Sequence, residues 1–134
     1  MIVATKKHNY IIDGKNKIRI ELIDHGIAYT VFQNGVRWIQ INKALLDYPD
    51  LYDLSIKHEL GHIRRNGFLS NILYDFIDSF RLSNFKLIEF QLKNPNSFIS
   101  NLPIYKDKDG WCFNVTMITM WSLLIIALLL NICI

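Results

Sequence analysis

Two histidines and a glutamate lie close together in the middle of this 134-residue chain, where residues 58–62 read HELGH. In a helix, His58 and His62 are four residues apart and project from one face, so both imidazoles can bind one metal ion. Glu59 can reach a water molecule on that ion without being a ligand itself. This set predicts hydrolytic zinc chemistry, in which Zn²⁺ activates a water and the carboxylate removes its proton. The alternative is a solvated helix face lined by two histidines.

A third ligand has to come from elsewhere in the chain, because a catalytic zinc ion normally has three protein ligands and one open position. The extended pattern HExxHxxGxxH is absent, since Arg65 and Phe68 occupy the positions of its glycine and its third histidine. The first acidic residues after His62 are Asp75 and Asp78. We therefore expect a carboxylate to complete the site.

Asp75 and Asp78 are three residues apart and share one helix face. If the chain turns at residues 66–67 and returns as an antiparallel helix, both aspartates come level with the metal ion. We predict that Asp75 binds the metal and that Asp78 orients His58 or His62, with the two roles exchangeable. The competing interpretation places both aspartates on a solvated helix face. Weaker candidates for the site are Glu89 and His25, whereas His8 is read as an ordinary residue.

The residues after Asn42 have helical spacing. A short segment stops at Pro49, and Asp50 is placed to cap a helix that contains HELGH and ends near residues 66–67. Gly61 costs this helix about 1 kcal/mol relative to alanine, which indicates that another group approaches the backbone there. A further helix, starting near residue 70 or 71, has an apolar face made by Ile72, Leu73, Phe76, Ile77 and Phe80. Residues 85–92 are expected to form one more helix or an extension of this one.

The first third of the chain reads as β-strands. Residues 17–24 alternate apolar Ile18, Ile20 and Leu22 with polar neighbours, as a half-buried strand does. Residues 28–33 and 36–41 are joined by Asn34-Gly35, the dipeptide that best tolerates a type I′ turn. The sequence thus predicts an α+β fold, in which a small antiparallel sheet precedes the HELGH helix and the acidic helix.

The last 20 residues, Val115 to Ile134, carry no charge. A helix of this length matches a hydrocarbon core of about 30 Å, and its Val, Leu and Ile residues favour insertion by about 3–7 kcal/mol. A buried helix of a soluble domain would normally show a polar stripe or a charged rim. We therefore predict a transmembrane helix, with residues 1–110 forming the main domain and residues 111–134 a C-terminal anchor.

Charged residues before the tail predict its orientation. Lys106 and Lys108 precede the apolar run, and the positive-inside rule then places the main domain in the cytoplasm. Trp111 and Trp121 are expected to anchor the helix near the membrane interface. Residues 111–134 therefore predict a single-pass membrane protein.

Charge and cysteine content limit the remaining possibilities. The net charge is only +3, and the basic residues are scattered among acidic ones and do not gather on one predicted face, so nucleic-acid binding is not expected. Cys112 and Cys133 lie about 30 Å apart if the tail is helical, at about 1.5 Å per residue, which excludes a disulfide between them. A reducing compartment is therefore expected, and the N-terminus lacks the apolar run of a signal peptide.

The stretch IKHELGHI, residues 56–63, resembles the active-site helix of the zincin metallopeptidases. The Leu-Gly pair between the histidines and the order of strands, HExxH helix and acidic helix are similar to the gluzincins and the single-domain minigluzincins. The resemblance covers roughly residues 17–80. It departs from the family in offering Asp75 and Asp78 where a glutamate is usual, and in placing Arg64 where an apolar residue is preferred.

The resemblance implies a zinc-dependent endopeptidase that cleaves a peptide or protein substrate. His58 and His62 would be ligands, Glu59 the general base, and an acidic residue on the next helix the third ligand. A strand at the edge of the sheet would hold the substrate. Tyr52, Tyr74 and Tyr105 are available as oxyanion partners, and packing explains each of them equally well. The alternative function is a membrane-anchored interaction protein that keeps the fold, and even the metal, without catalysis.

Overall fold

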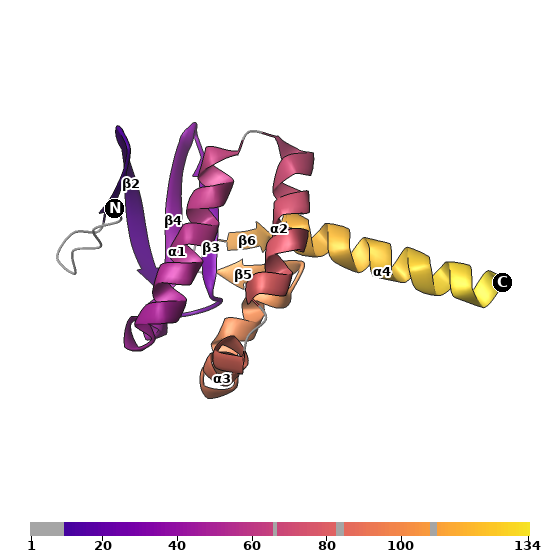
Figure 1. The fold of residues 1–134 in the computed structure, drawn as a ribbon. Helices are drawn as coiled ribbons and strands as arrows, with labels where there is room; N and C mark the ends of the chain where they lie inside the picture. Colours follow the sequence, from indigo (N-terminus) through magenta and orange to yellow (C-terminus); the bar gives the residue numbers. More distant parts are fainter. Residues whose placement is uncertain (1–9, 66, 83–84, 108–109) are drawn as a thin grey trace.

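The fold is α+β, with a small mixed sheet, five helices and one apolar C-terminal helix (Figure 1). The computed structural model describes residues 10–65, 67–82, 85–107 and 110–134, so His8 and Lys108 lie outside the described residues. The strands are β1 (Tyr10–Asp13), β2 (Asn16–Ile23), β3 (Ala28–Gln33), β4 (Val36–Asn42), β5 (Ile104–Asp107) and β6 (Gly110–Phe113). The helices are η1 (Lys43–Asp47), α1 (Pro49–Arg64), α2 (Phe68–Leu82), α3 (Phe85–Lys93), η2 (Pro95–Asn101) and α4 (Val115–Cys133), of which η1 and η2 are 3-10 helices.

The main sheet has the strand order β1-β2-β4-β3. β1 and β2 form one antiparallel hairpin. The predicted hairpin of β3 and β4 is present too, and the positive φ angles of Asn34 (51°) and Gly35 (77°) suit its tight turn. The prediction of an antiparallel sheet is wrong, however, because β2 pairs with β4 in parallel, with Ile20 opposite Ile39. The second hairpin inserts its returning strand next to β2, which leaves β3 at the edge of the sheet.

The link between the hairpins explains this arrangement. The Asn42 side chain donates to the carbonyl of Gly26 at 2.7 Å, and the Asn42 backbone N–H donates to the carbonyl of Ile27 at 2.8 Å. Both bonds fix the end of β4 against the loop that leaves β2. The alternation of apolar residues in β2 is the same whether the neighbouring strand is parallel or antiparallel. The sequence pattern therefore does not distinguish the two kinds of partner.

The hydrophobic core lies between the sheet and α1. The fully buried side chains include Ile11, Ile39, Ile41, Leu45, Leu60 and Phe90. Burial of a side chain of this size stabilises the fold by about 1.5–3 kcal/mol, so the core holds α1 firmly on the sheet. The position of the helix that carries HELGH is therefore fixed by its packing on the sheet.

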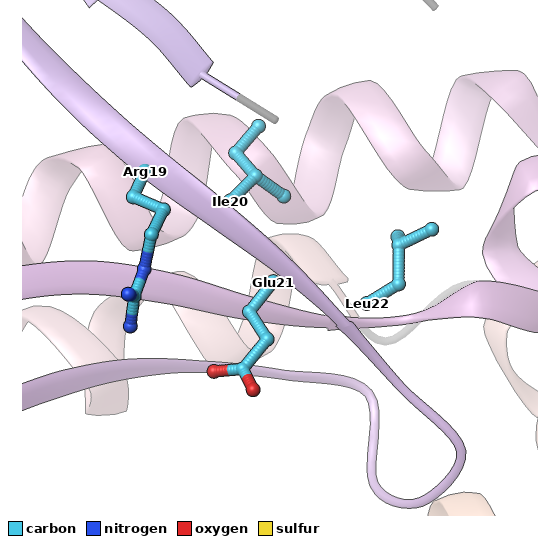
Figure 2. A pocket seen from close by; sticks show the side chains of 4 residues that line it. All are labelled: Arg19, Ile20, Glu21 and Leu22. Carbon is cyan, nitrogen blue, oxygen red and sulfur yellow. The ribbon is translucent and has the colours of Figure 1, made fainter. Parts of the chain in front are cut away.

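The outer face of β2 carries polar side chains that have no part in the core. Figure 2 shows Arg19 and Glu21 pointing away from the side on which Ile20 lies, around a shallow depression of about 280 Å3. The Glu21 carboxylate accepts hydrogen bonds from Trp38 Nε1 at 3.1 Å and from Gln40 Nε2 at 3.0 Å. Leu22 also lines the depression and is 49% exposed, although its position in the strand pattern predicted burial.

The boundaries of α1 and α2 differ slightly from the predicted ones. Pro49 occupies the first turn of α1 and Tyr48 is its N-cap, so Asp50 lies inside the helix and not at the cap. Proline suits this place because its missing N–H would have no helical partner there. After α1 ends at Arg64, α2 begins at Phe68, two or three residues earlier than expected, and runs beside α1 (Figure 1).

The segment after α3 contains η2 and the β5–β6 hairpin. β6 crosses the predicted boundary between residues 110 and 111. Asn114 caps α4, because its side-chain oxygen accepts from the Met117 N–H at 3.1 Å. α4 has a mean hydropathy of 2.2 with no part of it buried, and it is long and apolar enough to cross a membrane.

Candidate metal centre

Three side chains from α1 and α2 converge on one point. His62 Nε2 lies 2.7 Å from Asp75 Oδ1, and His58 Nε2 lies 3.1 Å from the same oxygen. The two Nε2 atoms are 3.2 Å apart. The structure thus brings together the two predicted histidines and Asp75, the aspartate predicted to be the third ligand.

The spacing of these three atoms suits a small divalent cation. Ligands at about 2.0–2.1 Å from a tetrahedral zinc ion lie about 3.3–3.4 Å from one another, so the observed spacing is slightly tighter than that of a zinc site. Two imidazoles and one carboxylate are also a ligand set of catalytic zinc sites. The side chains of His58, His62 and Asp75 are 13%, 15% and 17% exposed, so solvent reaches the group. These residues fit a zinc ion with an open fourth position.

The other ring nitrogen of each histidine has a partner on α2. His58 Nδ1 lies 2.6 Å from Asp78 Oδ2, and His62 Nδ1 lies 3.0 Å from Asn71 Oδ1. An oxygen at Nδ1 favours hydrogen on that nitrogen, so Nε2, which faces the centre, is the nitrogen that would bind a metal ion after losing its proton. Asp78 therefore lies where an orienting residue is needed.

Asn71 is a member of the site that sequence reasoning missed. It lies four residues before Asp75, so Asn71, Asp75 and Asp78 form one polar stripe on α2. This spacing is a signal that the sequence carries, although an amide is not among the usual ligands of zinc. An asparagine cannot be expected to complete a catalytic zinc site, yet it can position a histidine that does.

Glu59 is buried beside this group, with an exposed fraction of 6%. Its Oε2 accepts a hydrogen bond from Thr30 Oγ1 at 2.7 Å. Thr30 belongs to β3, the edge strand, so this bond joins the HELGH helix to the last strand of the sheet. One carboxylate oxygen of Glu59 is thereby held in place.

Charge and burial act in opposite directions on these groups. Burial lowers the pKa of His58, but the hydrogen bonds with Asp75 and Asp78 and the nearby Glu59 outweigh it and raise the pKa to about 9. Burial likewise raises the pKa of Asp75, yet the hydrogen bonds with His58 and His62 hold it well below its usual range. Asp75 is therefore an anion at neutral pH, as a metal ligand must be.

The pKa of Glu59 shifts in the opposite direction to that of Asp75. Burial raises it above the ordinary value, and this effect exceeds the lowering by the neighbouring His58 and by the hydrogen bond from Thr30. A carboxylate with a raised pKa is a better proton acceptor than an exposed one at the same pH. The environment of Glu59 is thus suited to general-base chemistry.

Tyr74 explains the glycine of HELGH. The Tyr74 ring stacks on the His58 ring, with centroids 5.1 Å apart. The guanidinium of Arg65, the C-cap residue of α1, lies 3.8 Å from the centroid of the Tyr74 ring. A Cβ atom at Gly61 would lie only 2.3 Å from the Tyr74 hydroxyl oxygen. The expectation that a group closely approaches the backbone at Gly61 is confirmed.

The substitution Gly61→Ala is expected to destabilise the chain despite the better helix propensity of alanine. Overpacking costs about 1–3 kcal/mol and propensity returns about 1 kcal/mol, so the free energy of unfolding falls by about 1 kcal/mol. Chemical unfolding of the full chain in detergent measures it. In a Tyr74→Leu background the same substitution should be neutral or stabilising, and equal effects in both backgrounds would contradict the close contact.

The first turn of α4 also contacts the site. Thr116 Oγ1 donates to Asp75 Oδ2 at 2.5 Å, which leaves Asp75 Oδ1 for the histidines. Thr116 is 41 residues away from Asp75 in sequence. The apolar helix is therefore joined directly to the predicted metal ligand, a contact that no local pattern predicts.

We expect Thr116→Val to weaken zinc binding by about 10–100-fold, the usual effect of losing a group that orients a ligand. The two side chains have nearly the same shape, so the change removes little besides the hydroxyl. Competition with a chromophoric chelator measures the affinity. Thr119→Val is the matched control, because Thr119 donates to the Val115 carbonyl within its own helix. An equal effect of both substitutions would show that Thr116 has no special role.

The weaker candidates lie elsewhere. Glu89 is exposed on α3 and forms an ion pair with Lys93 at 2.5 Å. His25 Nδ1 is 3.2 Å from Asp24, and the His25 ring lies near Tyr29 and Tyr105. Tyr52 is partly buried against the core.

No family model, curated protein or solved structure matches this chain.

Proposed function

We propose that this chain is a membrane-anchored, zinc-dependent metallopeptidase that hydrolyses peptide bonds. The observation that carries the proposal is the convergence of His58 Nε2, His62 Nε2 and Asp75 Oδ1 within 3.2 Å of one another, beside a buried glutamate. Two histidines and a carboxylate with solvent access favour a catalytic zinc site, because structural zinc sites are normally closed by four protein ligands.

Each residue has a distinct task in this proposal. His58, His62 and Asp75 bind the ion, while Asp78 and Asn71 keep the two imidazoles in the required tautomer. When bound, zinc lowers the pKa of a water molecule and polarises the scissile carbonyl. Glu59 accepts the proton of the attacking water and transfers it to the leaving amine.

The edge strand β3 is the proposed place for the substrate backbone. Thr30 of β3 contacts Glu59, so an extended peptide that pairs with this edge would pass beside the general base. Main-chain hydrogen bonds to an open strand edge bind extended peptides with little dependence on sequence. The proposal thus assigns β3 to positioning and α1 to chemistry.

The apolar helix α4 is proposed to cross the membrane, with the main domain on the cytoplasmic side. Its length, its mean hydropathy of 2.2 and the absence of buried residues in it support the anchor. Lys106 lies just before it and the residues after Val115 carry no charge, which supports the orientation. A non-catalytic interaction protein remains the alternative, but such a protein would not need a buried glutamate next to its metal site.

The test of this function is removal of the metal. We expect the full-length chain in detergent to bind one zinc ion, to cleave casein, and to lose both activity and thermal stability when a chelator is added. Zinc present at 100 times its dissociation constant stabilises a fold by about 2.7 kcal/mol. In His58→Ala, zinc content and activity should be lost, and the chelator should have no further effect. Zinc binding without cleavage would leave the non-catalytic alternative, and absence of zinc binding would exclude the metallopeptidase.

A further inference from the structure

The helix α2 has two opposite faces. Its polar stripe, Asn71, Asp75 and Asp78, faces the histidines of α1. At about 3.6 residues per turn, Leu69, Leu73 and Ile77 fall on the opposite side. These three side chains are 78%, 59% and 51% exposed, although the apolar face of a helix in a globular domain is normally buried. These side chains can be buried only by something other than the described residues of this chain.

The beginning of α4 lies against this same helix. The hydrogen bond between Thr116 and Asp75 fixes the first turn of α4 to the middle of α2. Figure 1 shows α4 projecting away from the sheet and α1, on the side where α2 lies. A bilayer that contains α4 therefore begins close to α2, and the exposed apolar face of α2 lies on the side away from α1.

The β5–β6 hairpin, which leads directly into α4, has a similar exposed face. Ile104 pairs with Phe113 and Lys106 pairs with Trp111, and all four side chains are exposed. The exposed fractions of Trp111 and Phe113 are 68% and 64%. Tryptophan is enriched at the membrane interface, and a lysine there can extend its ammonium group toward water. This composition fits lipid headgroups better than bulk water.

We infer that α2 is an interfacial helix, and that Leu69, Leu73 and Ile77, with Trp111 and Phe113, form a lipid-facing surface that docks the domain on the bilayer around α4. An amphipathic helix in this position buries its apolar face about 5–10 Å into the boundary between headgroups and acyl chains. The covering partner is the bilayer, because the surface adjoins the helix that enters it.

This placement extends the proposed function, on which it rests, to a class of substrate. An α-helix with its side chains is about 10–12 Å across, so Asp75 would lie about one helix diameter above the lipid-facing side of α2. The metal centre would then stand at the height of the headgroups. The substrates we infer are peptide segments that lie next to a membrane, such as those that flank a transmembrane helix.

The test is a measurement of depth on the full-length chain in phosphatidylcholine and phosphatidylglycerol vesicles. A polarity-sensitive dye is attached at Leu73→Cys in a Cys112→Ser, Cys133→Ser background, and quenching by brominated lipids is compared with quenching by iodide in water. Lys57→Cys, at an exposed position on α1, is the water-facing control. A dye on native Cys133, with only Cys112 replaced, reports separately whether α4 enters the bilayer.

We expect brominated lipid to quench the dye at position 73 and iodide to quench it several-fold less than at position 57. Equal iodide quenching at both positions would overturn the inference. The dye at position 73 could instead be protected from iodide without being quenched by brominated lipid. If that protection also varies with the protein-to-lipid ratio, the surface is covered by a second copy of the chain, and the inference is overturned. If the dye on Cys133 is not quenched by lipid, the proposed anchor itself is wrong, whereas zinc content of the same samples tests the metal site independently.

Discussion

Glu59→Gln is expected to lower kcat/KM for peptide cleavage by about 10²–10⁴-fold while zinc binding stays unchanged. Glutamine has nearly the same volume and its carbonyl can still accept the hydrogen bond that Thr30 donates to Oε2. It cannot take up a proton at neutral pH. The loss corresponds to about 3–5 kcal/mol of transition-state stabilisation, which is large enough to separate catalysis from metal binding.

The matched control for this substitution is Glu21→Gln. Glu21 also accepts two side-chain hydrogen bonds, from Trp38 and Gln40, but it lies on the outer face of the sheet. Its replacement should leave both zinc content and cleavage near the unsubstituted values. Full activity of Glu59→Gln would remove Glu59 from the mechanism, and loss of zinc in this variant would mean that Glu59 is a ligand.

The second large effect is expected at the two aspartates of α2, which should respond differently to the same change. Asp75→Asn should lose stoichiometric zinc, because it replaces an anionic ligand by a neutral amide with little affinity for the ion. Asp78→Asn should keep zinc with an affinity about 10–100-fold lower, since its carbonyl can still accept from His58 Nδ1. Zinc titrations of both variants measure the difference.

Asp53→Asn serves as the control for the loss of one negative charge, because Asp53 is exposed on α1. The visible spectrum of the cobalt-substituted chain adds a direct readout of the coordination geometry. It should change in Asp75→Asn and not in Asp53→Asn. If Asp78→Asn loses the metal and Asp75→Asn retains it, the two aspartates have exchanged roles, as the sequence alone allowed.

Much of the candidate site is determined by local periodicity. The spacing of His58 and His62 places both rings on one helix face, and the three-residue interval does the same for Asp75 and Asp78. The helices α1 and α2 run beside each other, which brings the two faces together. The structure brings His58, His62 and Asp75 within ligand distance, as this reasoning predicted. Whether zinc binds there stays a prediction.

The contacts that orient the candidate ligands could not be predicted from local periodicity. Asn71 reaches His62 from nine residues away, and Thr116 reaches Asp75 from 41 residues away. A single sequence shows which face of a helix a residue occupies, but not which distant element that face meets. Tyr74 was available as an oxyanion partner, yet its ring packs between His58 and Arg65 and against Gly61.

The sequence by itself determined the elements, the spacing of the chemical groups and the apolar character of Val115–Cys133, because these depend on residue type and on the periods of helix and strand. Only the tertiary structure decided that β4 lies parallel to β2, that β3 is the edge strand beside Glu59, and that α2 turns its apolar face outward. Strand order and helix orientation depend on contacts between segments far apart in the chain, which side-chain periodicity does not encode.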